Sequence, residues 1–222
     1  QPGFADISGT ATPAQLPVAT TSALGVVEPD GTTITIAAGV ISAVGGGSGG
    51  IVLLETKTAS ASAELDFLAT FSSAHRNYRL LVNNVFPATD RVSLYIQFST
   101  NGGATWDTTS ANYTWSRSYY AVNYTDNGAQ YDQSTAGLEL WDTDLHNAGV
   151  IGLSADFTIF YDPTGTNNLT MIGHVIGNNT VPRCYFIHYA ELYTGAGVIN
   201  AMRIIASSGN LTSGSVATYG YA

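Results

Sequence analysis

The sequence has almost no cysteine. Cys184 is the only one among 222 residues, which excludes a disulfide within the chain and a zinc site built on cysteine pairs. A small fold held together by disulfides is therefore excluded as well. Because Cys184 alternates with Phe186 in a strand-like run, we expect its thiol to be a small buried hydrophobic group rather than a nucleophile.

Charge is also scarce, and positive charge most of all. Charged residues make up 10% of the chain, against roughly 25% in ordinary soluble domains. Lys57 is the only lysine among seven basic residues, and the net charge is −9. Such a chain is not expected to bind nucleic acid or anionic membranes. Its polar surface must come mainly from hydroxyl and amide groups, as in extracellular β-proteins and in surfaces that face carbohydrate.

Long apolar runs are absent too. No window approaches 18 unbroken apolar residues, so we expect no membrane insertion. The chain starts at Gln1, without a basic segment followed by an apolar run of the kind that a secretory signal has. We expect it to be the C-terminal part of a longer protein.

The residues that are present predict four segments. Hydrophobic residues make up 45% of the chain and aromatic residues 11%, which is enough for a packed core. Residues 1–23 are rich in Ala, Thr, Pro and Ser and predict an extended lead-in. Residues 24–44 predict short strands, residues 45–50 a glycine-rich hinge, and residues 51–222 a distal β-sandwich domain.

The segment 24–44 contains three short β-branched runs separated by turn-forming residues, Pro29-Asp30-Gly31 and Ala37-Ala38-Gly39. Strands of this length bury too little surface to be stable alone. We therefore expect an oligomerising neck in which copies of the chain intertwine. The residues expected to be shared between copies are Val27, Ile34, Ile36 and Ile41. A flexible linker with some β-propensity is the alternative.

Beyond residue 50, longer strands alternate with turn clusters, which predicts an antiparallel β-sandwich that is jelly-roll-like. In Arg91–Ser99 the apolar residues occupy every second position, which predicts a half-buried strand. No amphipathic helix is expected beyond a turn near residues 142–147. The expected strands span residues 51–57, 64–71, 78–86, 91–99, 137–141, 155–161, 169–176, 183–193, 198–206 and 215–221.

Two stretches resemble bacteriophage fibre proteins. The sequence GVVEPDGTTITIAAGVISAV at Gly25–Val44 is similar to a segment that recurs in tail-fibre and head-fibre proteins, although Glu28 stands where that pattern often has Lys. The ending Met202–Tyr221 is similar to the C-terminal strand pair of distal fibre domains. The resemblance implies a homotrimer with a trimerising neck, and a receptor-binding distal domain on the virion surface that also contacts other virion proteins.

Ser99–Trp106, with the sequence STNGGATW, resembles the Asp-box hairpin of sialidases and other β-propellers, with Asn101 where Asp normally stands. In that motif the acidic residue locks the turn and the Trp packs beneath it. We expect Asn101 to cap backbone N–H groups through its side-chain oxygen. Because only one such box is present, sialidase activity is not expected.

The segment from Trp106 to Trp141 is dense in aromatic residues. Sugar rings stack on aromatic side chains and sugar hydroxyls pair with Asp, Asn and Arg, so this mixture predicts a surface loop that binds carbohydrate. The candidate ligand-binding residues are Trp106, Tyr113, Trp115, Arg117, Tyr119, Tyr120, Tyr124, Asp126, Tyr131 and Asp132, with Asn123 and Asn127 as further polar candidates. The alternative is that these aromatic residues pack in the sandwich or at an interface between chains.

No metal, cofactor or catalytic centre is expected. The residues Asp126, Asp132, Asp142 and Asp144 could supply oxygen ligands to Ca²⁺, but their spacing fits no known loop. The pairs Glu139 with Asp142, and Asp142 with Asp144, could serve in glycoside hydrolysis, but nothing in the sequence sets their separation.

Two histidines, His174 and His188, fall in expected strands and could approach each other or their copies in an oligomer. We expect them to be core or interface histidines. Three functions stay open: host attachment through surface carbohydrate, which the sequence favours, a structural head-decoration or fibre segment without glycan binding, and a depolymerase of surface polysaccharide.

Overall fold

The computed structural model describes residues 34–37, 40–43, 50–122, 125–133, 137–148, 151–164, 169–180 and 183–221, and only the backbone of residues 34–37, 40–43 and 143. The chain divides into two units, residues 1–48 and 49–222, within the glycine-rich segment. In the first unit β1 (Ile34–Ala37) pairs antiparallel with β2 (Val40–Ala43), with Ile36 opposite Ile41. Val27 lies outside the described residues, and the trimerising role of the neck stays a prediction.

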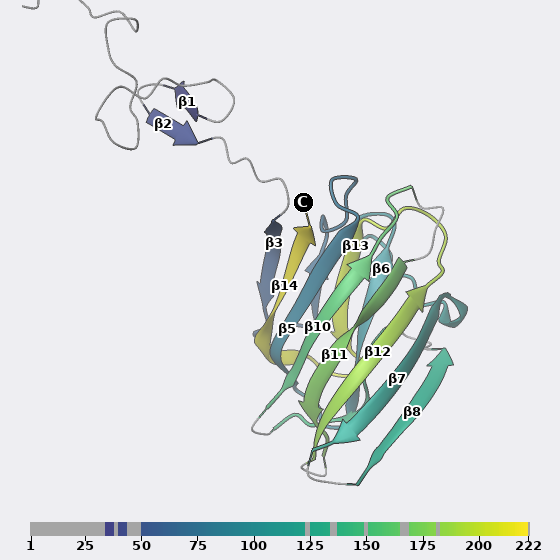
Figure 1. Ribbon diagram of the computed structural model, residues 1–222. Coiled ribbons are helices and arrows are strands. Elements are labelled where there is room, and N and C mark those ends of the chain that lie inside the picture. The colour runs from purple at the N-terminus through teal and green to yellow at the C-terminus, as the bar shows by residue number, and fades with distance from the viewer. Residues whose placement is uncertain are drawn as a thin grey trace, which may run out of the picture. The chain divides into compact units, whose positions relative to one another are not determined.

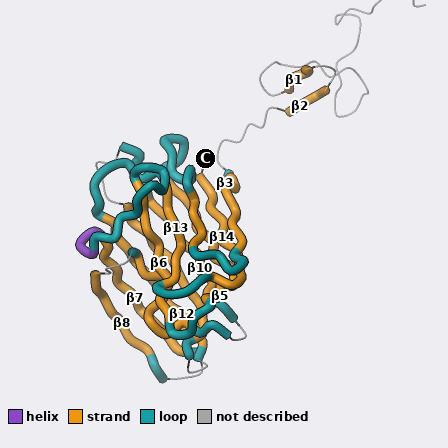
Figure 2. Tube along the Cα trace, turned by 180° about the vertical axis from the view of Figure 1, so that it is seen from behind, coloured by secondary structure: helices purple, strands orange, loops and turns teal. Residues whose placement is uncertain are grey.

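The second unit is built from strands β3 to β14, which Figure 1 labels. They are β3 (Ile51–Thr58), β4 (Glu64–Phe67), β5 (Asn77–Pro87), β6 (Val92–Ser99), β7 (Tyr113–Ala121), β8 (Asn127–Gln133), β9 (Leu138–Leu145), β10 (Leu153–Phe160), β11 (Leu169–Asn178), β12 (Cys184–Tyr193), β13 (Ala201–Ala206) and β14 (Leu211–Tyr221). Among the described residues, the one helical stretch is the 3₁₀ turn η3 (Ser110–Asn112), purple in Figure 2, and no helix is long and apolar enough to cross a membrane.

These strands form two antiparallel sheets that pack face to face. The larger sheet has the order β3-β14-β5-β10-β11-β12-β7-β8, and Figure 1 shows its strands side by side. The smaller sheet has the order β4-β13-β6-β9. The prediction of an all-β, antiparallel β-sandwich is confirmed.

Alternating side chains build the core between the sheets. In β10, Leu153, Phe157 and Ile159 are at most 1% exposed, whereas Phe160 is 42% exposed. Successive residues of a strand point to opposite faces, so one sequence supplies both a core face and a surface face. Fully burying each large apolar side chain contributes roughly 1.5–3 kcal/mol. The same alternation in β11 and β12 carries the core towards the β7–β8 end of the larger sheet.

Strand β6 is not the half-buried strand that the alternation predicts. Its apolar positions face the core, but Ser93, Gln97 and Ser99 on the opposite face are also only 1%, 5% and 2% exposed. Arg203 of β13 covers this face and donates from Nε to Oε1 of Gln97 at 2.7 Å. The hydroxyl of Ser207 accepts from the backbone N–H of Ser93 at 3.0 Å. Polar neighbours therefore cover the polar face, which alternation within one strand does not reveal.

The aromatic segment is not a surface loop, because most of it forms the β7–β8 hairpin at one end of the larger sheet. Its period-two pattern is hidden in the sequence, since aromatic and polar residues occupy both faces of β7. Strand β8, NGAQYDQ, also lacks the β-branched residues that favour strands. The turn expected near residues 142–147 is mostly strand, because β9 continues to Leu145.

The outer face of the larger sheet carries the two strand histidines. His174 and His188 lie directly opposite each other on β11 and β12, with ring centroids 5.2 Å apart. Both are exposed, so neither is a core histidine in the single chain. Cys184 is only half-buried, and the expectation of a buried thiol was wrong because Cys184 is the first residue of β12, opposite the last residue of β11.

The box-like loop Ser99–Trp106 has the predicted structure. Oδ1 of Asn101 accepts from the backbone N–H of Thr105 at 2.9 Å, and Nδ2 of Asn101 donates to the hydroxyl of Thr105 at 2.8 Å. A Cβ at Gly103 would lie 3.2 Å from the ring of Trp106, which places the indole against the loop. The guanidinium carbon of Arg203 lies 4.9 Å from the centroid of the same ring. The loop is a structural element, as expected.

Candidate functional site

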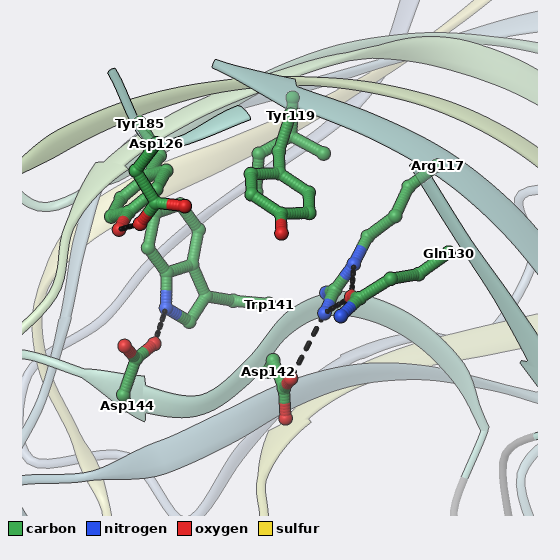
Figure 3. A pocket seen from close by; sticks show the side chains of 9 residues that line it. Arg117, Tyr119, Asp126, Gln130, Trp141, Asp142, Asp144 and Tyr185 are labelled. Atoms are coloured by element: carbon green, nitrogen blue, oxygen red, sulfur yellow. Dashed lines mark hydrogen bonds and ion pairs between the residues drawn. The ribbon is translucent and has the colours of Figure 1, made fainter. Parts of the chain in front are cut away.

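A pocket of about 240 Å³ lies where the β7–β8 end of the larger sheet meets β9, the edge strand of the smaller sheet. Strands β7, β8, β9 and β12 and the segment before β8 contribute its walls. Figure 3 shows the polar groups of the lining side chains converging on one space. The lining residues are Arg117, Tyr119, Asp126, Gln130, Trp141, Asp142, Asp144, Tyr185 and Ile187.

Two glycines make room for the aromatic side chains of the pocket. Gly128 of β8 lies opposite Tyr119 of β7, and a Cβ there would lie 2.7 Å from the hydroxyl oxygen of Tyr119. A Cβ at Gly177 of β11 would lie 2.8 Å from the indole of Trp141. Real side chains do not tolerate such distances, so these glycines let the two aromatic groups lie across neighbouring strands.

Arg117 forms one wall and is bound on every side. Nε and Nη2 donate to Oε1 of Gln130 at 2.9 and 2.5 Å, and Nη2 also donates to Oδ2 of Asp142 at 2.9 Å. Nη1 donates to Oε1 of Glu139 at 3.1 Å and to the hydroxyl of Tyr189 at 3.2 Å. These five bonds equal the five N–H groups of a guanidinium. Burial opposes the charge, but these partners hold the pKa of Arg117 above its usual value.

Two further carboxyl groups lie behind Arg117. Glu139 and Glu191 are 8% and 3% exposed. Burial, together with repulsion from Asp142, raises the pKa of Glu139 to about 7 despite the attraction of Arg117. Burial, with a contribution from Glu139, also raises the pKa of Glu191 well above its usual range. Neither carboxyl oxygen of Glu191 has a hydrogen-bond partner among the described residues, so nothing there offsets the cost of burying its charge.

The opposite side of the pocket is aromatic. The hydroxyl of Tyr185 donates to Oδ2 of Asp126 at 2.6 Å, and Nε1 of Trp141 donates to Oδ1 of Asp144 at 3.0 Å (Figure 3). The ring of Tyr185 lies 6.4 Å from that of Trp141 and 6.1 Å from that of Tyr119, both edge-on. Trp141 is 2% exposed, whereas both tyrosines are half-buried. The indole is therefore the floor, and the tyrosines are the accessible walls.

This arrangement combines apolar ring faces with hydrogen-bond acceptors. Within the described part of the chain, three aspartates line the pocket, with Arg117 as the single cation of the lining. Such a site suits a compact ligand with C–H faces and many hydroxyl donors. In the part of the chain that the structure describes, no group of three or more His, Cys, Asp or Glu side chains is placed to hold a metal ion.

The structure separates the predicted site residues. Arg117, Tyr119 and Asp126 line the pocket. Tyr113 and Trp115 are core residues, 0% and 8% exposed, although they belong to the same inward face of β7. Tyr120 and Tyr131 are 52% and 86% exposed on the outer face of the hairpin, and Asp132 and Asn127 are exposed on β8. Trp106 packs against Arg203. Tyr124 and Asn123 lie outside the described residues.

Three lining residues, Gln130, Tyr185 and Ile187, were not among the sequence candidates, and Asp142 and Asp144 were considered only as metal ligands or a hydrolytic pair. Trp141 marks the end of the aromatic segment, so a sequence signal for it was present. Tyr185 gave none, because its place beside Tyr119 depends on the pairing of β12 with β7 across a long stretch of chain.

A second hollow, of about 440 Å³, lies on the outer face of the larger sheet and includes His174 and His188. Its charged side chains, Arg79 and Asp156, already bind each other through two hydrogen bonds of 2.8 and 2.6 Å. The smaller pocket brings together three Tyr or Trp rings and three aspartates, against two Tyr rings and one aspartate in the hollow. We therefore place the candidate site there.

Comparison of the chain with protein-family models, with curated proteins and with solved structures found no match in any of the three.

Proposed function

We propose that residues 51–222 are the distal domain of a bacteriophage fibre and that the domain attaches the virion to a carbohydrate of the host surface. The observation that carries the proposal is the pocket between β7, β8, β9 and β12, where Tyr119 and Tyr185 offer ring faces beside the carboxylates of Asp126, Asp142 and Asp144. Sugars are recognised by this combination of ring stacking and hydrogen bonding to their hydroxyls. The likeness of Gly25–Val44 and Met202–Tyr221 to fibre proteins supports the same proposal.

The strand order supports a jelly-roll-like frame with insertions. Strands β3-β14-β5-β10 oppose β4-β13-β6-β9, which makes two sheets of four as in jelly rolls. Strands β11, β12, β7 and β8 extend one of these sheets. Three of the four added strands border the candidate site, so in this proposal the additions carry the binding function.

The proposal includes a homotrimer that also contacts other virion proteins. The outer face of the larger sheet exposes several apolar side chains, among them Phe160 (42%), Ile172 (50%) and Ile176 (38%). Contiguous exposed apolar surface is typical of sheets that contact another protein. Three pockets on one trimer would bind a repetitive surface polysaccharide with high avidity even if each site is weak.

A matched pair of variants tests the proposal. Tyr119 and Tyr120 are neighbours in sequence, but the first faces the pocket and the second the outer face. On an array of bacterial surface polysaccharides, the wild-type chain should bind and Tyr119→Ala should lose most of the signal, whereas Tyr120→Ala should keep it. Tyr185→Phe removes only one hydroxyl group and keeps the ring, so it separates the loss of a hydrogen bond from the loss of packing.

The opposite pattern of binding by the two tyrosine variants would assign the glycan site to another face of the sheet. If Tyr120→Ala abolishes binding and Tyr119→Ala does not, the outer face binds the glycan. If the folded wild-type chain binds no glycan, the chain is a structural part of the particle. Release of reducing ends from a bound polysaccharide would show a depolymerase, and we propose binding without cleavage.

A further inference from the structure

Among the described residues, Arg117 is the only cation in the lining of the pocket, but it has no donor left for a ligand. Its five N–H groups already reach Gln130, Glu139, Tyr189 and Asp142. Its side chain is 7% exposed. An anionic ligand would have to displace one of these buried bonds and leave the former acceptor unsatisfied, which is unfavourable. Arg117 therefore shapes the wall and does not capture anions.

The other charged groups of the lining are negative. The side chains of Asp126 and Asp142 are 40% and 47% exposed, so both carboxylates face the solvent that a ligand would replace. Asp144 adds a third carboxylate to the lining, and its Oδ1 accepts the hydrogen bond from Nε1 of Trp141. A second guanidinium, that of Arg183, is not part of the lining, but it forms an ion pair with the lining residue Asp126, with Nη1 3.4 Å from Oδ2. Three aspartates beside two guanidinium groups still leave the pocket with an excess of negative charge, as has the whole chain with its net charge of −9.

We propose that this pocket selects sugar units without an anionic group and that a free amino group on the sugar strengthens binding. This inference rests on the proposed carbohydrate-binding function. Hydroxyl and ammonium groups donate to the carboxylates, so they gain from the excess of acceptors. A uronic acid, sialic acid or phosphorylated sugar meets like charge and finds no available guanidinium, and like charges brought together oppose binding.

Three probes with the same ring and different charge test the inference: oligosaccharides of glucosamine, glucose and glucuronic acid, on an array that also carries sialylated and phosphorylated glycans. The wild-type chain should bind amino and neutral sugars, with acidic sugars weaker by roughly tenfold or more. High salt should weaken the amino sugars most, because salt screens the attraction between ammonium and carboxylate.

Two charge variants locate the effect. Asp142→Asn and Asp144→Asn remove one charge each and keep an oxygen for the bond from Arg117 or Trp141. Each should reduce the advantage of amino over neutral sugars by several-fold at low salt. Glu55→Gln removes a carboxylate from β3, at the far edge of the larger sheet, and should leave the ranking unchanged.

The outcomes separate the two proposals. Preferential binding of acidic glycans would overturn the charge selection and leave carbohydrate attachment standing. An amino-sugar advantage that is equal in wild type, Asp142→Asn and Asp144→Asn would place the selection outside this pocket and overturn the inference in the same way. No binding to any probe on the array would overturn the proposed function itself, and the inference with it.

Discussion

Replacing Glu139 by Gln tests the electrostatics of the buried layer behind the pocket. The pKa of Glu139 is about 7 in the folded domain, against an ordinary value of 4.5. At about 1.4 kcal/mol for each pH unit, this difference corresponds to about 3 kcal/mol of folding free energy. The folded domain holds this proton more tightly than the unfolded chain does. The stabilisation is therefore complete below about pH 4.5 and is lost as the pH rises to about 7.

Urea unfolding of wild type and Glu139→Gln at a series of pH values between about 4.5 and 8 measures this effect. The free energy of unfolding of wild type minus that of the variant should fall by about 3 kcal/mol as the pH rises from about 4.5 to about 7 and should stay level above that. Carboxyl groups with a lowered pKa, such as those of Asp107 and Asp156, are common to both proteins and cancel in the difference. A difference that does not change with pH would refute the argument that burial governs Glu139.

Substitutions at three further positions test other parts of the structure by the same unfolding assay. Arg117→Met leaves buried Glu139 without its cation and should lower the free energy of unfolding by about 3–5 kcal/mol near pH 8. The loss should be clearly smaller near pH 5, where Glu139 is protonated, and an equal loss at the two pH values would contradict the charge argument. Asn101→Ala should lose about 1 kcal/mol, whereas Asn101→Asp should lose little because a carboxylate caps the same N–H; equal losses would contradict the capping role. Gly177→Ala should lose about 1–3 kcal/mol by overlap with Trp141, and an unchanged stability would show that the indole can move aside.

The sandwich could be predicted because its strands can be recognised from local sequence patterns. In β10 the apolar residues Leu153, Ala155, Phe157 and Ile159 occupy every second position, and turn-forming residues follow the strand. The loop at Asn101 was also predictable, since its hydrogen bonds join residues four positions apart. In both cases the interactions that determine the structure are short-range or periodic, so one stretch of sequence contains them.

The pocket could be predicted only in part, because it depends on pairings between distant segments. Arg117 and Tyr119 were found through the aromatic composition of their segment, but so were Tyr113 and Trp115, which are buried in the core. Composition does not tell which residues of a strand lie over the core and which extend beyond the edge of the opposite sheet. That Arg117 is saturated by its own neighbours follows from three other strands, and no local pattern contains that information.

A crystal structure of residues 51–222 with a bound oligosaccharide, chosen from the strongest signals of the array, tests the central claim most directly. We expect the sugar in the pocket, packed against the rings of Tyr119 and Tyr185, with its hydroxyl or amino groups within hydrogen-bond distance of Asp142 or Asp144. A sugar bound instead on the outer face of the larger sheet, beside His174 and His188, would contradict the assignment of the pocket.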